Sequence, residues 1–110
     1  MSYDIRFREK PDGSNQWVYV GDEWINLTAN ASTLVKEACG HYPSQWNGKK
    51  CSTLGPVLMY AASRMRLCPD YYKKFEDPGG WGTVSNTADI LQQIAEVCNR
   101  FPDAILDVSC

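Results

Sequence analysis

The chain has 110 residues, a formal net charge of -2 and an isoelectric point of about 5.3. This length predicts a single domain over residues 1–110, and the acidic balance argues against nucleic acid as the partner. No apolar run approaches the ~20 residues that cross a bilayer. The N-terminus also lacks the apolar core of a signal peptide. We therefore expect a protein of the cytoplasm with no membrane partner.

Two N-terminal segments have the period-two alternation of half-buried strands. Residues 3–8 alternate apolar and charged side chains, and residues 16–20 carry aromatic side chains on one face and β-branched side chains on the other. Residues 11–15, between them, have the Pro, Asp, Gly, Ser and Asn composition of a turn. The pattern predicts an antiparallel hairpin.

A short helix is predicted after the hairpin. Residues 24–30 alternate apolar and polar side chains and end where Thr28 or Asn30 can cap a helix that runs through Ala38. Gly40 is then expected to end this helix in the left-handed conformation.

Residues 41–53 contain a proline, an Asn-Gly pair and two lysines, and are predicted to form a loop. Ser52 or Thr53 is expected to cap the next helix, with Pro56 in its first turn, where a missing N–H does no harm. Pro69 is expected to stop this helix.

Residues 71–75 are predicted as a short helix that precedes a glycine-rich loop. The clearest amphipathic helix follows the loop and ends near Arg100. Its apolar side chains recur at helical spacing at Ile90, Leu91, Ile94, Val97 and Cys98.

Residues 104–108 form a short apolar segment that reads as a C-terminal strand. A two-stranded sheet is marginal alone, so we expect this strand to pair with the N-terminal hairpin. The predicted fold class is α+β: a small three-stranded antiparallel sheet packed against three to four helices.

The glycine-rich loop around Trp81 is the first candidate site. Three glycines surround the tryptophan, and Thr83, Ser85 and Asn86 follow at a predicted helix start. Backbone N–H groups at a helix start favour anions, and a flat ligand can stack on an indole ring. The alternative is structural: large aromatic side chains dominate small cores, which favours a buried Trp81 between sheet and helices.

Asn26, Thr28 and Asn30 lie at alternating positions, so they share one face of an extended segment. They can bind the polar edge of a ligand, or they can bond to nearby backbone and fix the entry to the helix. The ligand hypothesis requires this segment to face the glycine-rich loop across one pocket. Its site residues are Trp81, Thr83, Ser85, Asn86, Asn26 and Asn30.

The cysteines are odd in number, and the sequence carries no secretion signal, so we expect reduced thiols. They are Cys39, Cys51, Cys68, Cys98 and Cys110. Cys39, His41 and Cys51 are the alternative candidate site, for a zinc-dependent or cysteine-dependent activity, with Cys68 as a further possible ligand. A structural zinc site usually needs a second close pair of ligands, which this spacing lacks, so no metal is expected.

No spacing of catalytic residues typical of a hydrolase or a metalloprotease is present, and the chain is expected not to be an enzyme and to need no cofactor. The acidic pairs Asp22–Glu23 and Glu76–Asp77 fall in predicted turns and are interpreted as solvated.

Several motifs resemble a group of small proteins that bacteriophages and prophages encode. They are Asn26-Leu27-Thr28-Ala29-Asn30 after Trp24, residues 69–75, Gly80-Trp81-Gly82-Thr83 and Phe101-Pro102-Asp103-Ala104. The resemblance covers residues 24–108 and departs from the group in the loop from Cys39 to Cys51. It implies a phage or prophage context and brings no assigned activity.

The resemblance leads us to expect an accessory protein that acts by binding in the cytoplasm of the host cell. Such a protein either neutralises a component of host defence or sequesters a nucleotide-like small molecule. The expected partner is thus a host protein or a small nucleotide-like ligand. A homodimer is one of the oligomeric states that the sequence leaves open.

Overall fold

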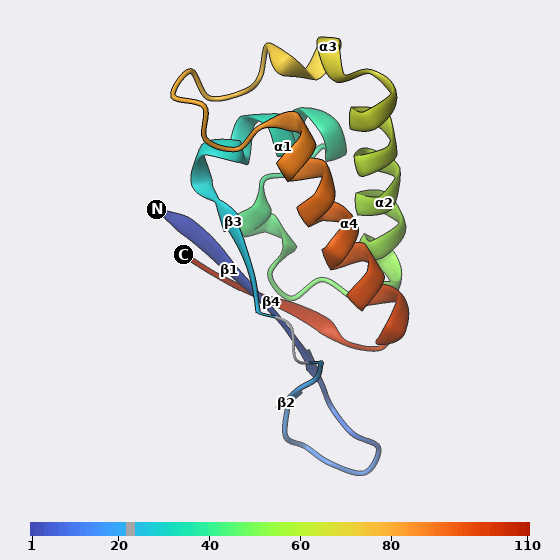
Figure 1. Ribbon diagram of the computed structural model, residues 1–110. Coiled ribbons are helices and arrows are strands. Elements are labelled where there is room, and N and C mark those ends of the chain that lie inside the picture. The colour runs from blue at the N-terminus through green and yellow to red at the C-terminus, as the bar shows by residue number, and fades with distance from the viewer. Residues whose placement is uncertain (22–23) are drawn as a thin grey trace.

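The structure of the chain, a computed structural model, describes residues 1–21 and 24–110 (Figure 1). It confirms the α+β class, because one sheet of four antiparallel strands lies against a layer of helices. The N-terminal hairpin extends beyond the helical layer (Figure 1). The predicted acidic turn at Asp22 and Glu23 lies outside the described residues.

Strand β1 (Ser2–Glu9) lies at the centre of the sheet. Strand β4 (Ile105–Ser109) pairs antiparallel with it and places Val108 opposite Ile5. This pairing confirms that the C-terminal strand returns beside the N-terminal hairpin.

Two short strands share the other edge of β1. Strand β3 (Ile25–Thr28) pairs with residues 2–5, and strand β2 (Val18–Tyr19) pairs with Arg8 and Glu9. The sheet therefore has a fourth strand beyond the three predicted, and the alternating segment before the first helix supplies it. Strand β2 is shorter than predicted because both of its residues are exposed, so no core supports a longer pairing.

The inner face of the sheet forms one core with helices α2 (Cys51–Leu67) and α4 (Val84–Arg100). The strands contribute the buried side chains of Ile5, Phe7, Ile25, Leu27 and Leu106. The two helices contribute Leu54, Leu58, Leu91 and Ile94, among others. Burial of each large side chain contributes about 1.5–3 kcal/mol, which makes this layer the main source of stability. No helix in the described part of the chain has the length and apolar character needed to cross a membrane.

The start and end of the first helix follow the predicted signals. Thr28 caps the short 3-10 helix η1 (Ala29–Ala31), since its hydroxyl accepts a hydrogen bond from the Asn30 N–H. Helix α1 (Ser32–Cys39) continues from it and ends at Gly40, whose φ of 88° lies in the left-handed region.

The start of α2 differs from the prediction. The helix begins at Cys51, and neither Ser52 nor Thr53 caps it. The N–H groups of Cys51 and Ser52 instead donate to the carbonyls of Ala104 and Pro102, in the connection between α4 and β4. Carbonyl groups that are distant in sequence thus accept the hydrogen bonds of the free N–H groups at the helix start. Pro56 consequently lies inside the helix, beyond its first turn.

Helix α2 ends before Pro69, as predicted, and α3 (Pro69–Lys73) follows directly. The predicted loop 41–53 contains a further element, the 3-10 helix η2 (Pro43–Trp46), and buries Trp46 completely. The segment after η2 covers the outer edge of β4, since the N–H of Leu106 donates to the carbonyl of Lys49. Covering this edge protects it from pairing with other chains.

Candidate functional site

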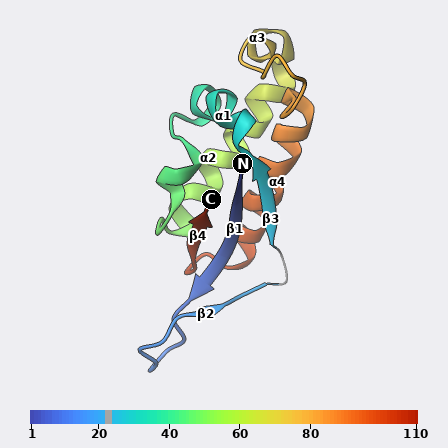
Figure 2. The same cartoon turned by 90° about the vertical axis from the view of Figure 1, so that its left-hand side faces the viewer.

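The polar side chains of the alternating strand β1 lie on the outer face of the sheet, which the helices do not cover. Ile5 and Phe7 of β1 are buried, so Asp4, Arg6 and Arg8 project from the opposite face. In Figure 2 the strands lie toward the viewer, with α2 and α4 behind them. This face is therefore accessible to a partner.

Arg6 contacts two aromatic rings on this outer face. Its guanidinium carbon is 4.2 Å from the ring centroid of Tyr19 and 5.1 Å from the ring centroid of Trp24. Both distances lie within the ~6 Å over which a cation is attracted to a ring face. The rings remain open to solvent, with Tyr19 exposed to 53% and Trp24 to 65%.

Asp107 fixes these side chains from β4. The register of the sheet pairs Asp107 with Arg6. Its carboxylate accepts a hydrogen bond of 2.9 Å from the Tyr19 hydroxyl and lies 3.8 Å from an Arg6 nitrogen. We call Arg6, Tyr19, Trp24 and Asp107 the Arg6 cluster. Contacts from three strands hold it, which positions the two exposed rings before any partner arrives.

Basic side chains continue along the same face. Arg8 follows Arg6 at the next outward position of β1, and the Lys10 ammonium lies 5.4 Å from the ring centroid of Trp17. Among the described residues of this face, Asp107 accepts a hydrogen bond from Tyr19 and Asp4 accepts one from the Asn26 amide. The cations Arg6, Arg8 and Lys10 outnumber these two carboxylates, which favours binding of a carboxylate by the described part of this face.

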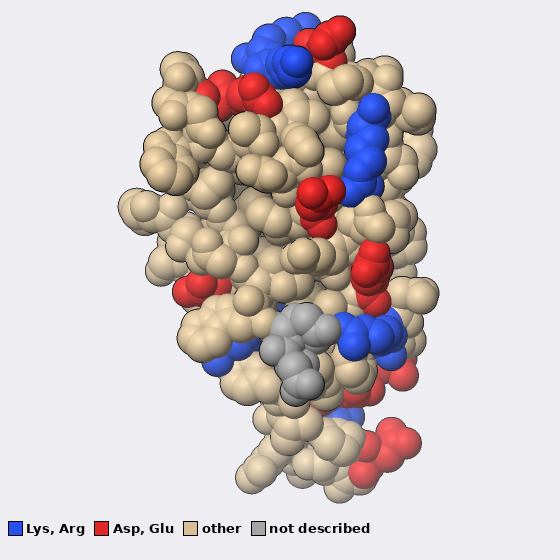
Figure 3. Space-filling view, viewed as in Figure 1, with Lys and Arg blue, Asp and Glu red and all other residues tan. Residues whose placement is uncertain are grey.

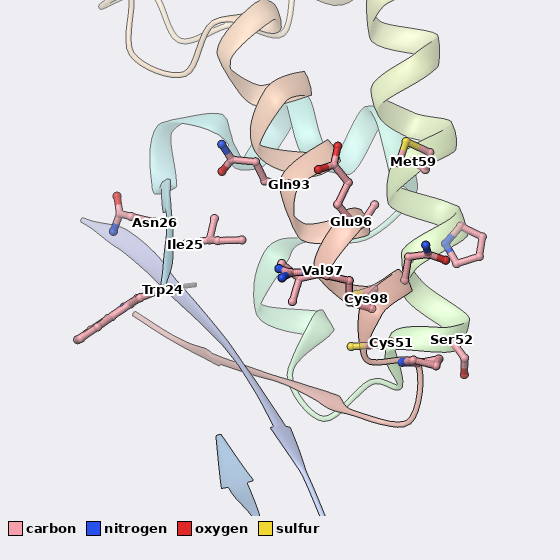
Figure 4. A pocket seen from close by; sticks show the side chains of 16 residues that line it. Trp24, Ile25, Asn26, Cys51, Ser52, Met59, Gln93, Glu96, Val97 and Cys98 are labelled. Carbon is pink, nitrogen blue, oxygen red and sulfur yellow. The ribbon is translucent and has the colours of Figure 1, made fainter. Parts of the chain in front are cut away.

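A groove of about 1120 Å³ adjoins the Arg6 cluster at Trp24 (Figure 4). It runs from Trp24 and Ile25 across the C-terminal half of α4 to the N-terminal half of α2. Apolar side chains such as Val97 and Met59 line it, together with the sulfurs of two cysteines. Charged side chains of both signs are scattered over the face seen in Figure 3, so this face carries no broad field of one sign among its described residues.

The glycine-rich loop does not bury its tryptophan. Trp81 is 67% exposed, so the interpretation that it fills the space between sheet and helices is wrong. The glycine after it makes the close contact instead: a Cβ atom at Gly82 would lie 2.9 Å from the Cβ of Ala31 and 3.1 Å from Cγ2 of Thr28. The loop and the segment from Thr28 to Ala31 therefore touch through a glycine, and the indole ring projects away.

The N-terminus of α4 already has partners within the chain. Thr83 caps the helix by accepting a hydrogen bond from the Asn86 N–H. A carboxylate oxygen of Glu76 accepts a hydrogen bond of 2.7 Å from the Val84 N–H. Glu76 is therefore a half-buried helix cap, which corrects the interpretation that it is a solvated turn residue. A carboxylate thus already occupies the place where an external anion would bind.

The remaining predicted site residues are dispersed. Asn26 donates to the Ser2 hydroxyl and the Asp4 carboxylate, which ties β3 to β1 on the outer face. Asn30 is exposed after β3, and Ser85 and Asn86 are exposed in the first turn of α4. The two segments touch only where Gly82 meets Thr28 and Ala31, and none of the described pockets contains both Asn26 and Trp81.

The alternative site at Cys39, His41 and Cys51 is not gathered by the fold. The Cys39 thiol donates to the carbonyl of His41, whereas Cys51 lines the groove beside α4. Burial raises the pKa of the Cys39 thiol, which keeps it protonated at neutral pH. The described residues include no group of three or more His, Cys, Asp and Glu side chains placed to hold a metal ion.

The Arg6 cluster was not singled out from the sequence, although one signal for it was present. The alternation of residues 3–8 already separates Arg6 from the buried face of β1, and Tyr19 belongs to the aromatic face predicted for residues 16–20. Asp107 and Trp24 join them only through the strand pairing, which spans the whole length of the chain.

Comparisons with known proteins return no match: no family model matches the chain, and no curated protein and no solved structure is significantly similar to it.

Proposed function

We propose that the chain is a non-enzymatic accessory protein of a phage or prophage and binds a host protein in the host cytoplasm through the outer face of its sheet. The observation that carries the binding proposal is the Arg6 cluster, in which one guanidinium contacts two largely exposed aromatic rings. The phage context, and with it the neutralisation of a host defence component, rests on the motif resemblance alone.

The composition of the Arg6 cluster supports a protein partner. Tryptophan, tyrosine and arginine are the residues that most often supply the binding energy of protein interfaces. Ordering side chains on binding costs about 0.5–1.5 kcal/mol each. The contacts of Tyr19 with Arg6 and Asp107 already order its side chain in the free protein, so less entropy is lost on binding.

The charges of the outer face define the chemistry of the partner. Arg6, Arg8 and Lys10 lie in a row beside aromatic rings, while the acids Asp4 and Asp107 are hydrogen-bonded within the chain. We therefore propose a partner surface with an apolar centre and flanking carboxylates. A single-stranded nucleic acid would use the same cations and rings, but the net charge of -2 opposes its binding.

The proposal is tested by affinity capture from host extract, followed by measurement of binding to the purified partner. Trp24→Ala should weaken binding at least about 30-fold, the effect of losing an interface hot spot of ~2 kcal/mol. Trp81→Ala is the matched control, since Trp81 is as exposed as Trp24 but lies outside the outer face. Equal loss in both variants, or loss with Trp81→Ala alone, would contradict the proposal.

The class of partner is tested separately. Arg6→Gln should weaken binding to the purified protein and reduce its dependence on salt, because a charged pair is lost. A labelled single-stranded oligonucleotide serves as the competing probe. If the oligonucleotide binds and Trp24→Ala abolishes its binding, the surface belongs to a nucleic-acid partner and the protein-partner proposal fails.

A small nucleotide-like ligand remains the second candidate, because Gly82 brings the glycine-rich loop against Thr28. Its site would use Trp81, Thr83, Ser85 and Asn86 with Asn26 and Asn30. Native mass spectrometry of the purified protein tests for a retained ligand. Asn26→Ala and Asn86→Ala should then abolish ligand binding without a change in melting temperature, and unchanged binding in both variants would place the pocket elsewhere.

A further inference from the structure

Two cysteines from different helices meet at the floor of the groove. Cys51 is the first residue of α2, and Cys98 lies in the last turns of α4. Both side chains are buried, and both line the groove. Figure 4 shows them side by side, with Cys51 below Cys98.

The two helices approach closely at this point. Gly55 lies one turn after Cys51 on the same face of α2, and a Cβ atom at Gly55 would lie 2.9 Å from the Cβ of Cys98. The glycine removes the side chain that would otherwise separate the helices. A disulfide requires two Cβ atoms about 3.5–4.5 Å apart, and the missing side chain at Gly55 lets α2 and α4 approach closely one turn from Cys51.

We propose that Cys51 and Cys98 are a redox modification site and form a reversible disulfide by exchange with a low-molecular-weight disulfide. The Cys51 thiolate attacks one sulfur of the small disulfide, whose S–S bond breaks and releases one small thiol. The Cys98 sulfur then attacks the Cys51 sulfur of the mixed disulfide and releases the second small thiol. Both cysteines are oxidised, the small disulfide is reduced to two thiols, and these carry away the two protons.

The environment of the pair assigns the order of the two steps. Cys51 is the first residue of α2, and a helix N-terminus stabilises a thiolate, so Cys51 is the attacking nucleophile; the neighbouring Cys98 thiol also lowers the pKa of Cys51. The neighbouring Cys51 thiol, with burial, raises the pKa of Cys98, which stays protonated until the mixed disulfide has formed. Cys51 is fully buried, so exchange requires the start of α2 to open locally and to break the hydrogen bonds of the Cys51 and Ser52 N–H groups.

The other cysteines provide the background for a test. Cys39 donates to a backbone carbonyl away from the groove, and Cys68 and Cys110 are exposed. A variant with Cys39→Ser, Cys68→Ser and Cys110→Ser keeps only the buried pair. It is treated with oxidised glutathione and analysed by intact mass, peptide mapping and thermal unfolding, in parallel with the unmodified chain.

The expected result is a monomer that has lost two hydrogen atoms, with a peptide map that joins Cys51 to Cys98. Its melting temperature should rise by roughly 10 °C, because the bond closes a long loop in the unfolded chain, and dithiothreitol should reverse the rise. Cys51→Ser and Cys98→Ser, each made in the three-serine background, should show no such rise. The proposal is overturned if glutathione stays attached to the pair-only variant, if both thiols remain free, or if the bond forms only between molecules.

Discussion

Gly82 and Ala31 touch so closely that the Cβ of an alanine at position 82 would lie 2.9 Å from the Cβ of Ala31. Gly82 also adopts a φ of 75°, in the left-handed region. One glycine thus meets two requirements at once, a backbone conformation and a close approach. The contact holds the glycine-rich loop against the end of β3 and determines where α4 begins.

We predict that Gly82→Ala lowers the free energy of unfolding by about 2–4 kcal/mol, from left-handed strain together with overpacking. Gly80→Ala is the matched control: Gly80 has a φ of 83°, but a Cβ atom there would meet nothing within 4 Å, so only the strain of about 1 kcal/mol should apply. Urea unfolding measures both values. Equal losses in the two variants would show that the contact with Ala31 contributes nothing.

A second prediction concerns the tryptophans. Trp46 is fully buried, whereas Trp17, Trp24 and Trp81 are exposed to 43%, 65% and 67%. Trp46→Ala should therefore lose about 3–5 kcal/mol of stability, and Trp81→Ala should stay within about 0.5 kcal/mol of the unaltered chain. Chemical denaturation gives both values.

Fluorescence gives an independent measure of the same arrangement. Trp46→Phe should remove the component of emission that iodide does not quench, because the other tryptophans are accessible to solvent. A quencher-resistant component that survives in Trp46→Phe and disappears in Trp81→Phe would contradict the exposed position of Trp81.

Local signals in the sequence predicted those parts of the fold that depend on neighbouring residues. The alternation of residues 3–8 predicted β1, because side chains of a strand alternate between its faces. Thr28 and Gly40 predicted the ends of the first helical segment, because capping depends on one side chain or one glycine.

Features that depend on distant segments of the chain could not be predicted from such local signals. The start of α2 is fixed by carbonyls of Pro102 and Ala104, roughly half the chain away, so no cap is visible in its own sequence. The exposure of Trp81 depends on the path of a loop whose contact runs through Gly82 and not through the indole.

The candidate site also combines features that neighbouring residues determine with features that depend on distant segments. The sequence separates Arg6 from the buried face of β1 and places Tyr19 on the aromatic face of its own segment, but it does not fix how the strands are paired. A slip of one residue in register would turn Asp107 to the other face of the sheet. The Arg6 cluster exists only because the observed register places Arg6 opposite Asp107.

A third prediction concerns the ionisation of Tyr71. Its hydroxyl donates a hydrogen bond of 3.1 Å to the Glu37 carboxylate. This bond, with the negative charge of Glu37, raises the pKa of Tyr71, because both oppose formation of the phenolate. Since the folded-state pKa is raised, the interaction is present below the ordinary tyrosine pKa and is lost as pH rises through the raised value.

The measurement is an alkaline titration followed by NMR of ring-labelled tyrosine, with Tyr71→Phe to assign the resonance. Glu37→Gln should lower the pKa of Tyr71 toward its ordinary value, because the charge and the strong acceptor are gone. Glu96→Gln is the control, since Glu96 accepts from Gln92 and is not among the groups that shift Tyr71. An unchanged pKa in Glu37→Gln would show that the two side chains do not interact in solution.

The last prediction concerns the C-terminal strand. Leu106 of β4 is fully buried opposite Phe7, and its main-chain N–H and carbonyl both bond to the segment after η2, at Lys49 and Gly48. Leu106→Ala should therefore lower the free energy of unfolding by about 2–5 kcal/mol, because a large cavity opens between the sheet and the helices. Ser109→Ala, at the exposed end of the same strand, should change it by less than about 0.5 kcal/mol.

Deletion of residues 104–110 extends this test to the whole strand. The deletion removes the carbonyl of Ala104 that accepts from the Cys51 N–H, so it should weaken the start of α2 as well as the sheet. It also uncovers the apolar side chains that Leu106 protects, and the truncated protein should aggregate on mild heating. Light scattering and thermal unfolding measure these effects. A truncated protein that stays monomeric with an unchanged melting temperature would rule out β4 as part of the folded core. That result would also contradict the assignment of Asp107 to the Arg6 cluster, because this assignment depends on the pairing of β4 with β1.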